Sequence, residues 1–466
     1  AAAGSFTTIS ASSNATITGN ATVGGTLGVT GVTTLVDVNV TGEINFDGAP
    51  GTAGQYLQSS GDGVTPVWDT LSLNDLSDVL IVDNSLYIGH DPTSTDSTAE
   101  FNIAVGVTAL DAVTTGDSNI AIGHNALGAS TTSSETIAIG HESGAAITTT
   151  SGKHVFVGHQ AGKGNTTGAS NTGVGYHALT ANTTGQYNTA LGSEAFSNLN
   201  TVGSDVPEYN TAVGYQAGTA VTYGDKGTYI GSRAGRAVTT ASNNTFVGAF
   251  AGVATTTGAD NVAIGHNALY TNVDGDGTVA IGHEALYTME PADGLSHNTA
   301  IGYRAGKTAT TGTGLTYLGS TAGQSNLAGD DNTGIGRGAL TDTTVGSDNT
   351  AVGSRALTAN VDGSKAVAIG TLALQNQEPS GATDTYNVGV GYNSGNDIIT
   401  GVQNTVIGAL SGDAVTTGSG NTAIGYNTSF SASGASNQTV VGGGAAGHGD
   451  NKITLGNASV TAIEPG

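Results

Sequence analysis

A repeating pattern of apolar and polar positions, about 17 residues long, organises the chain from about residue 85 to residue 459. Its clearest copy is Asn-Val-Ala-Ile-Gly-His-Asn-Ala-Leu at residues 261–269. Each copy centres on a glycine that follows Ile, Val or Leu, and the third residue after the glycine is small in every copy except the first, which has Pro92. A fixed short period of this kind predicts a solenoid, whose coils bury their apolar faces by stacking on one another.

The alternation within each copy predicts a short β-strand. In Asn-Thr-Ala-Ile-Gly, Thr and Ile would point to one side of the strand, and Ala and Gly to the other. Since a 17-residue coil encloses only a thin interior, we expect the Ile/Val row to fill the inside. The Ala/Gly side would then lie where another backbone approaches, at a seam between subunits. The Asn residues four positions before the glycines are expected to stack and to hydrogen-bond along the ladder.

Together these features predict an all-β chain with a parallel β-solenoid of about 22 coils over residues 85–459, followed by a tail at 460–466. Three steps between the central glycines are longer than the rest, which places longer loops at 197–209, 287–297 and 375–386, one after every fifth coil. Each loop contains adjacent Glu and Pro residues. Because loops on a rigid scaffold can vary without disturbing it, they are candidates for receptor binding. The candidate residues are Pro207, Glu208, Tyr209, Glu290, Pro291, Glu378 and Pro379. The alternative is that the loops are surface excursions or clasps between subunits.

The first 84 residues follow other patterns. From residue 1 to residue 50, short segments alternate β-branched residues with glycine. Single ribbons of this kind would have unpaired edges, so we expect a trimeric shaft in which three chains intertwine. Residues 51–84 break the pattern and contain the only tryptophan, Trp68, among several leucines. We expect a small knob or adaptor that caps the solenoid, with a binding knob as the alternative.

Composition limits the classes of function. Of 466 residues 75 are glycine, 5% are aromatic and 10% are charged, which is too little bulky apolar surface for a conventional core. Chains of such composition are usually disordered, but the Ile, Val or Leu that precedes every central glycine argues against disorder here. The net charge of −25, with only 11 Lys and Arg residues, makes nucleic acid and anionic membranes poor partners. Without cysteine there are no disulfides or thiolate metal sites, as fits a protein working outside the cell.

The ends of the sequence and its apolar runs add two expectations. No apolar run reaches the ~18 residues that a membrane-spanning helix needs, and no signal peptide stands at Ala1. The only methionine is Met289, so we expect the chain to have been processed or truncated at its start.

Histidine and tyrosine recur at the position directly after the central glycine. The candidates are His90, His124, His141, His159, His266, His283, Tyr176, Tyr215, Tyr303, Tyr392 and Tyr426. Three interpretations remain open: packing at a subunit seam or corner, contact with a glycan through ring faces and ring nitrogens, and metal binding by pairs such as His124 and His141. We expect no metal and no cofactor. The Asp-rich turns at 274–277 and 330–332 lack a full calcium loop, so solvated turns are the simpler explanation.

The repeats resemble two related families over about four fifths of the chain. Asn-Thr-Ala-Ile-Gly-Tyr is similar to the repeated Asn-Ser-Val-Ala-Ile-Gly of trimeric autotransporter adhesin heads, which form left-handed parallel β-rolls packed as trimers. The copies ending in Ala-Leu or Ala-Gly, the Gly-Gln-Tyr-Leu-Gln-Ser-Ser-Gly segment at 54–61 and Lys-Ile-Thr-Leu-Gly-Asn-Ala-Ser at 452–459 resemble bacteriophage tail fibres. Many such fibres lose an endosialidase-type C-terminal chaperone after trimer assembly.

This resemblance implies a homotrimeric, left-handed β-roll in a virion tail fibre. Its partners would be tail or baseplate proteins and a bacterial surface polysaccharide or lipopolysaccharide, bound through many weak contacts. The nearest alternative is a bacterial trimeric adhesin or surface filament at the cell surface. A tailspike that depolymerises glycan is a further alternative, but no pair of carboxylates is singled out by the sequence, so we expect no enzyme activity.

Overall fold

The computed structural model describes residues 45–46, 49–50, 52, 55–58, 67–70, 78–89, 98–148, 152–200, 208–290, 294 and 296–462. Strands and turns account for the regular structure of these residues, and no helix is found among them. The chain divides into two compact units, residues 1–72 and 73–466. Among the described residues there is no helix long and apolar enough to cross a membrane.

In the first unit, two short antiparallel pairs are described. Strand β1 (Asn45–Phe46) pairs with β2 (Ala49–Pro50). Strand β3 (Gln55–Gln58) pairs with β4 (Val67–Thr70), with Leu57 opposite Trp68. Most of the expected shaft at 1–50 and much of the expected knob at 51–84 lie outside the described residues, so both remain predictions.

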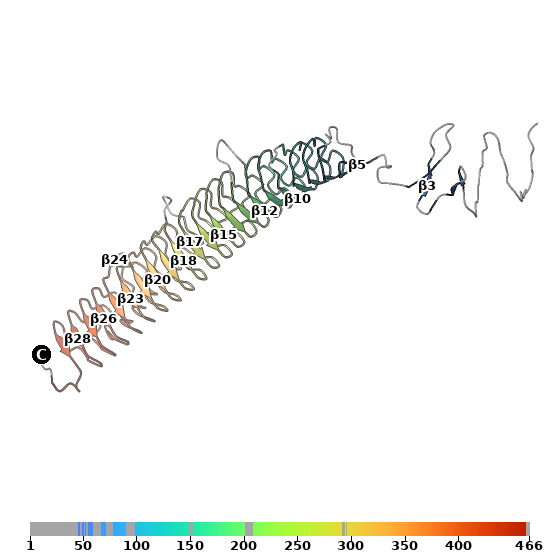
Figure 1. The fold of residues 1–466 in the computed structure, drawn as a ribbon. Coiled ribbons are helices and arrows are strands. Elements are labelled where there is room, and N and C mark those ends of the chain that lie inside the picture. Colours follow the sequence, from blue (N-terminus) through green and yellow to red (C-terminus); the bar gives the residue numbers. More distant parts are fainter. Residues whose placement is uncertain are drawn as a thin grey trace, which may run out of the picture. The chain divides into compact units, whose positions relative to one another are not determined.

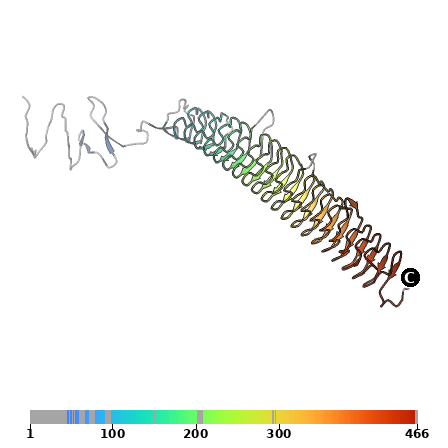
Figure 2. The same ribbon diagram turned by 180° about the vertical axis from the view of Figure 1, so that it is seen from behind.

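The second unit is a parallel β-solenoid, as the sequence predicts (Figures 1 and 2). Asn102 and Asn119, which are hydrogen-bonded to each other in successive coils, stand 17 residues apart. After β5 (Val79–Val82) and β6 (Ser85–Ile88), the ladder runs through β7 (Ile103–Val105), β8 (Ile120–Ile122), β9 (Ile137–Ile139), β10 (Val155–Val157), β11 (Thr172–Val174), β12 (Thr189–Leu191), β13 (Thr211–Val213), β14 (Thr228–Ile230), β15 (Thr245–Val247), β16 (Val262–Ile264), β17 (Val279–Ile281), β18 (Thr299–Ile301), β19 (Thr316–Leu318), β20 (Thr333–Ile335), β21 (Thr350–Val352), β23 (Val367–Ile369), β25 (Val388–Val390), β26 (Thr405–Ile407), β27 (Thr422–Ile424), β28 (Thr439–Val441) and β29 (Ile453–Leu455).

The two ends of this ladder differ. At the first end, β5 pairs antiparallel with β6 through a tight turn at Asp83 and Asn84, whose φ angles of 46° and 58° suit a two-residue hairpin. At the other end, β29 pairs with β28. No pairing joins β29 to β5 in the described part of the chain, so the sheet is an open ladder.

The side chains that point inward are not the ones the sequence pattern suggested. In β16 the middle residue Ala263 is fully buried, whereas Ile264 is 37% exposed. The same alternation holds in the three-residue strands from β7 to β28, so the expectation that Ile and Val fill the interior is wrong. The cause is the opposite wall of the coil. There Leu269 and its equivalents are buried and occupy the thin interior, leaving space on the strand for alanine.

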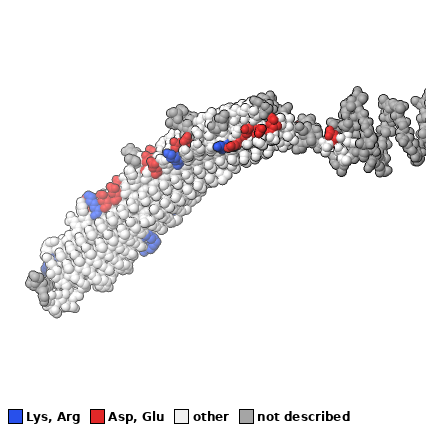
Figure 3. All heavy atoms as spheres, in the orientation of Figure 1, with Lys and Arg blue, Asp and Glu red and all other residues white. Residues whose placement is uncertain are grey.

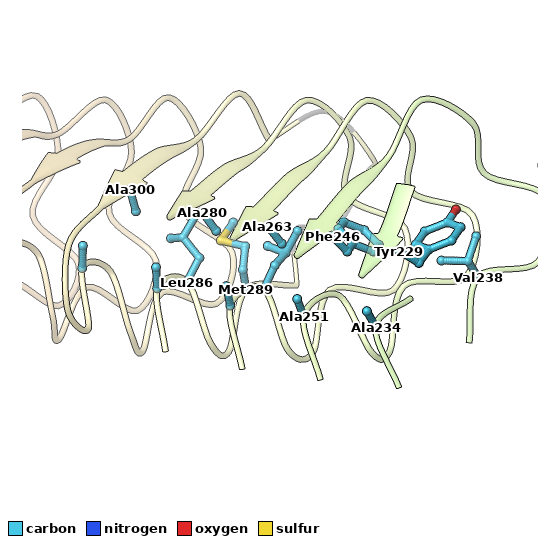
Figure 4. Close-up of a cluster of buried hydrophobic side chains, with 14 of the residues drawn as sticks. Tyr229, Ala234, Val238, Phe246, Ala251, Ala263, Ala280, Leu286, Met289 and Ala300 are labelled. Carbon is cyan, nitrogen blue, oxygen red and sulfur yellow. The ribbon is translucent and has the colours of Figure 1, made fainter. Parts of the chain in front are cut away.

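Several aromatic side chains at the alanine position of a strand enter the core where glycine six residues later makes room. Phe246 stands at the alanine position of β15, and the residue six positions later is Gly252 in place of leucine. A Cβ atom on Gly252 would lie 2.4 Å from Cε2 of Phe246. Figure 4 shows Phe246 beside the alanine and leucine coils that follow it. In the coils of Phe246 and Leu269 the large side chain is therefore supplied from opposite walls.

The central glycine permits close stacking of coils. Gly265 has a φ of +132°, and a Cβ atom there would lie 2.5 Å from the carbonyl oxygen of Gly282 in the next coil. A small residue is thus needed because another backbone comes close, as expected. That backbone belongs to the next coil of the same chain, however, and the predicted position of the subunit seam on this side is wrong.

The predicted asparagine ladder is confirmed. The backbone N–H of Asn261 donates to Oδ1 of Asn244 at 2.9 Å, and the Nδ2 of Asn261 donates to the carbonyl of Gly275 at 2.7 Å. The Oδ1 of Asn261 in turn accepts the N–H of Thr278 at 2.8 Å. The side-chain amide of Asn261 thereby satisfies the backbone groups of Gly275 and Thr278.

The three longer loops are described to different extents. Residues 201–207, 291–293 and 295 lie outside the described residues, and with them Pro207 and Pro291. In the third loop, β24 (Thr383–Asp384) pairs in parallel with β22 (Gly363–Ser364) of the preceding coil.

Candidate receptor-binding surfaces

The histidines and tyrosines that follow the central glycines form an exposed column, because the parallel register repeats one position from coil to coil. The rings of His124 and His141 stack with centroids 5.2 Å apart, and those of His141 and His159 stack at 5.0 Å. Tyr176 continues this stack, 5.4 Å from His159. A second stack joins His266, His283 and Tyr303 at 5.3 and 5.4 Å. His90 lies outside the described residues.

This stacking restricts what the column can bind. Inside a stack each ring face is covered by the next ring, so a sugar could stack only on the end rings, while the ring edges remain open to hydrogen bonding. The near-parallel rings of His124 and His141, inclined by 12°, also do not converge on one point as metal ligands would. Across the described residues, no group of three or more His, Cys, Asp or Glu residues could hold a metal ion.

Three tyrosines of the column stand apart from the stacks. Tyr215 has serines at the column position in both neighbouring coils, although the guanidinium of Arg233 lies 5.8 Å from its ring centroid. Tyr392 and Tyr426 are 54% and 62% exposed, and Ala409 holds the position between them. These tyrosines therefore have small neighbours along the column.

Carboxylates beside the column clamp adjacent coils together. Glu142 accepts hydrogen bonds from Lys163 at 2.6 Å and from Gln160 at 2.7 Å. Glu284 lies 2.8 Å from both Arg304 and Lys307. In each case the hydrogen bond from lysine is the main cause that lowers the pKa of the glutamate. On the face seen in Figure 3 charged residues gather along one edge of the solenoid, and much of the remaining surface carries none.

The loop candidates occupy three different environments. Tyr209 is exposed and stacks on Tyr187, with centroids 5.1 Å apart and rings inclined by 5°. Glu208 is partly buried beside it, and its N–H donates to Asp225 at 2.9 Å. Glu290 is partly buried and accepts the N–H of Val273 at 2.9 Å, and burial raises its pKa. In the third loop Glu378 is exposed but Pro379 is buried.

An apolar column on the sheet face is the feature that the sequence interpretation missed. The residue before each central glycine, at the end of its strand, points outward and is at least partly exposed. The most exposed members are Ile122, Leu191, Ile230, Ile264, Leu318, Ile369, Ile407, Ile424 and Leu455. At ~4.8 Å between coils, this column runs for about 100 Å. Every coil thus carries an aliphatic residue at this outward position.

Comparison with protein-family models gives no match, and comparison with curated proteins gives no similar sequence.

Proposed function

We propose that this chain forms a homotrimeric adhesive fibre, in which the outward aliphatic columns of three chains meet and the exposed columns and loops bind a bacterial surface glycan. The observation that carries the proposal is the continuous aliphatic column on the sheet face. Soluble monomers rarely expose contiguous apolar patches beyond ~300–600 Å², and larger ones mark interfaces.

The geometry of the sheet supports a closed assembly around one axis. From β7 onward each strand of the ladder is only three residues long, so the sheet face is about 10 Å wide. A narrow aliphatic strip can meet two symmetry-related copies along a common axis, and association would cover side chains such as Ile264 and Leu318. Threonines at the other end of the same strands, as in β18 and β21, add methyl groups beside the aliphatic column.

Adhesion would come from repetition. The His/Tyr column and the loops recur along the solenoid, and three chains multiply each weak contact, so that avidity far exceeds the affinity of one site. The resemblance of the repeats to tail fibres favours a virion tail as the extracellular location, with tail or baseplate proteins and a surface polysaccharide or lipopolysaccharide as partners. The resemblance to adhesin heads supports a bacterial surface filament as the second candidate.

The proposal is tested by measuring binding of the full chain to a panel of purified capsular polysaccharides and lipopolysaccharides. We expect at least one of them to bind, with an apparent affinity at least tenfold higher for the assembled fibre than for an Ile264→Asp/Ile281→Asp variant that fails to assemble. The replacement of two exposed Thr residues, Thr311→Asp and Thr417→Asp, adds equal charge away from the column and should change neither assembly nor binding. Absence of binding to every preparation would contradict the adhesive role, and release of reducing sugar would identify a depolymerase.

A further inference from the structure

A polar cavity opens near the last coils of the solenoid. Its volume is about 150 Å³, and it spans three consecutive coils. It is lined by Asn393, Asn396, Asp397, Leu410, Ser411, Asp413 and Asn427. This volume is below the ~300–1,000 Å³ of pockets for drug-sized ligands, so the cavity fits one small ring or chain unit.

The lining offers hydrogen-bond acceptors without a matching cation. Asp397 and Asp413 line this cavity from adjacent coils. Hydrogen bonding to Asp413, then burial and the charge of Asp413, raise the pKa of Asp397. The Oδ1 atom of Asn396 is buried and finds no hydrogen-bond partner among the described residues. No Lys, Arg or His lines the cavity. A ligand that brings an ammonium group and hydroxyl donors would satisfy these acceptors.

Two exposed tyrosines flank the cavity. Tyr392 and Tyr426 directly precede the lining residues Asn393 and Asn427 in the chain. Backbone hydrogen bonds from Leu410 to Tyr392 at 2.8 Å and from Asn427 to Ala409 at 2.9 Å place these positions in one column. The tyrosines are therefore two coils apart, ~9.6 Å, with alanine between them. Ring stacking needs about 4.5 Å on each side, so one flat ring fits between them.

We propose that this cavity and its two tyrosines form a subsite for one amino-sugar unit of a surface glycan. The ammonium group would contact the carboxyl groups of both Asp397 and Asp413, and the ring hydroxyls would meet Asn393, Asn396 and Asn427. The sugar ring would stack between Tyr392 and Tyr426. The proposal specifies the ligand chemistry of the proposed adhesive fibre and rests on that function.

Two other uses of the cavity fit the observations less well. Calcium also prefers oxygen ligands, but it would leave the paired tyrosines without a role. Glycoside hydrolysis needs two carboxyl groups ~5–9.5 Å apart around the scissile bond, whereas Asp397 and Asp413 are within hydrogen-bonding reach.

The test is an NMR titration of the full chain at pH 7 with glucosamine, N-acetylglucosamine, glucose, glucuronate and calcium chloride. We expect saturable binding of glucosamine, at least tenfold weaker binding of the other sugars, and loss of binding in Asp413→Asn. Tyr426→Ala should weaken glucosamine binding about tenfold or more. The matched controls are Asp330→Asn and Tyr223→Ala, which lie outside the His/Tyr column and the three loops and should bind as the parent chain does.

Three results would overturn the subsite: binding of calcium without sugar, equal binding of glucosamine and glucuronate, or glucosamine binding that survives Asp413→Asn. Binding to the polysaccharide panel distinguishes failure of the subsite from failure of the adhesive role. If the parent chain and Asp413→Asn bind a polysaccharide equally well, attachment stands and the subsite is wrong. If glucosamine binds but no polysaccharide does, the subsite stands and attachment is wrong.

Discussion

Tyr317 and Gly323 share one space in the core: a Cβ atom on Gly323 would lie 2.2 Å from Cζ of the Tyr317 ring. Tyr317 stands at the alanine position of β19 and is fully buried, with its hydroxyl accepting a hydrogen bond from Asn326 at 2.6 Å. In the coil of Ala263 the same space is filled by alanine on the strand and by leucine, Leu269, six residues later.

This relationship predicts a compensating pair of substitutions. Gly323→Leu alone should lower the free energy of unfolding by at least ~1–3 kcal/mol through overpacking, and Tyr317→Ala alone by ~3–5 kcal/mol through a cavity. The double variant should be less destabilised than the sum of the two, because leucine at this position already has a φ near 52° in coils such as that of Leu269. Denaturant unfolding of the four proteins gives the coupling free energy, and simple additivity would contradict the shared space.

Replacing a central glycine by alanine should lower the stability of the solenoid more than the same change at other glycines with positive φ. Gly265→Ala should destabilise the solenoid by more than the ~1–2 kcal/mol of a left-handed backbone, since its Cβ would lie 2.5 Å from the carbonyl oxygen of Gly282. Gly420→Ala is the matched control, because its φ is +69° but its Cβ would meet no atom within 4 Å. Thermal melts that show equal losses for both variants would refute close stacking of coils as the reason for glycine.

His154 predicts a pH dependence of stability. It takes the place of asparagine in the buried ladder, where its Nδ1 accepts the N–H of Asn171 at 3.2 Å, and burial lowers its pKa from 6.5 to about 4. The unfolded chain therefore binds a proton that the folded chain does not. Stability from this group is present in full above pH 6.5 and falls by about 3 kcal/mol as the pH drops to about 4.

Chemical denaturation between pH 4 and pH 7 measures this effect. His154→Asn places at this coil the asparagine that most coils of the ladder carry, so the stability of this variant should change less over this pH range, by roughly the same amount. Identical pH profiles for the two proteins would show that His154 is protonated while folded. His141→Asn, which alters an exposed histidine, serves as the control.

The period, the strand and the asparagine ladder could be predicted because each follows from spacing alone. The alternation alone does not predict which side of the strand faces inward, since Thr-Ala-Ile alternates equally well in either direction. The signal in the sequence that does indicate it is the occasional aromatic residue at the alanine position, such as Phe156 or Tyr229, paired with glycine six residues later. An aromatic side chain opposed by glycine indicates a filled interior. For the candidate site, the column was predictable, but the stacking of its rings and the cavity at Asp397 and Asp413 depend on contacts between coils.

Because alanine faces inward on the strand and isoleucine faces outward, we expect two substitutions to have different effects on folding and association. Ala280 is fully buried, so Ala280→Trp should disrupt folding of its coil. Ile264 is 37% exposed, so Ile264→Asp should leave the folded coil intact and weaken association of the chains. Circular dichroism combined with the mass in solution separates the two effects. A folded but dissociated Ala280→Trp chain would contradict this orientation of the strand.

The molar mass of the folded, purified chain by light scattering tests the central claim most directly. A single chain has a mass of 45.5 kDa, and we predict a particle of about three times this mass, which Ile264→Asp combined with Ile281→Asp shifts toward one chain. A folded parent chain that remains at 45.5 kDa at micromolar concentration would contradict the account, because the aliphatic column would then be exposed to water with nothing to cover it.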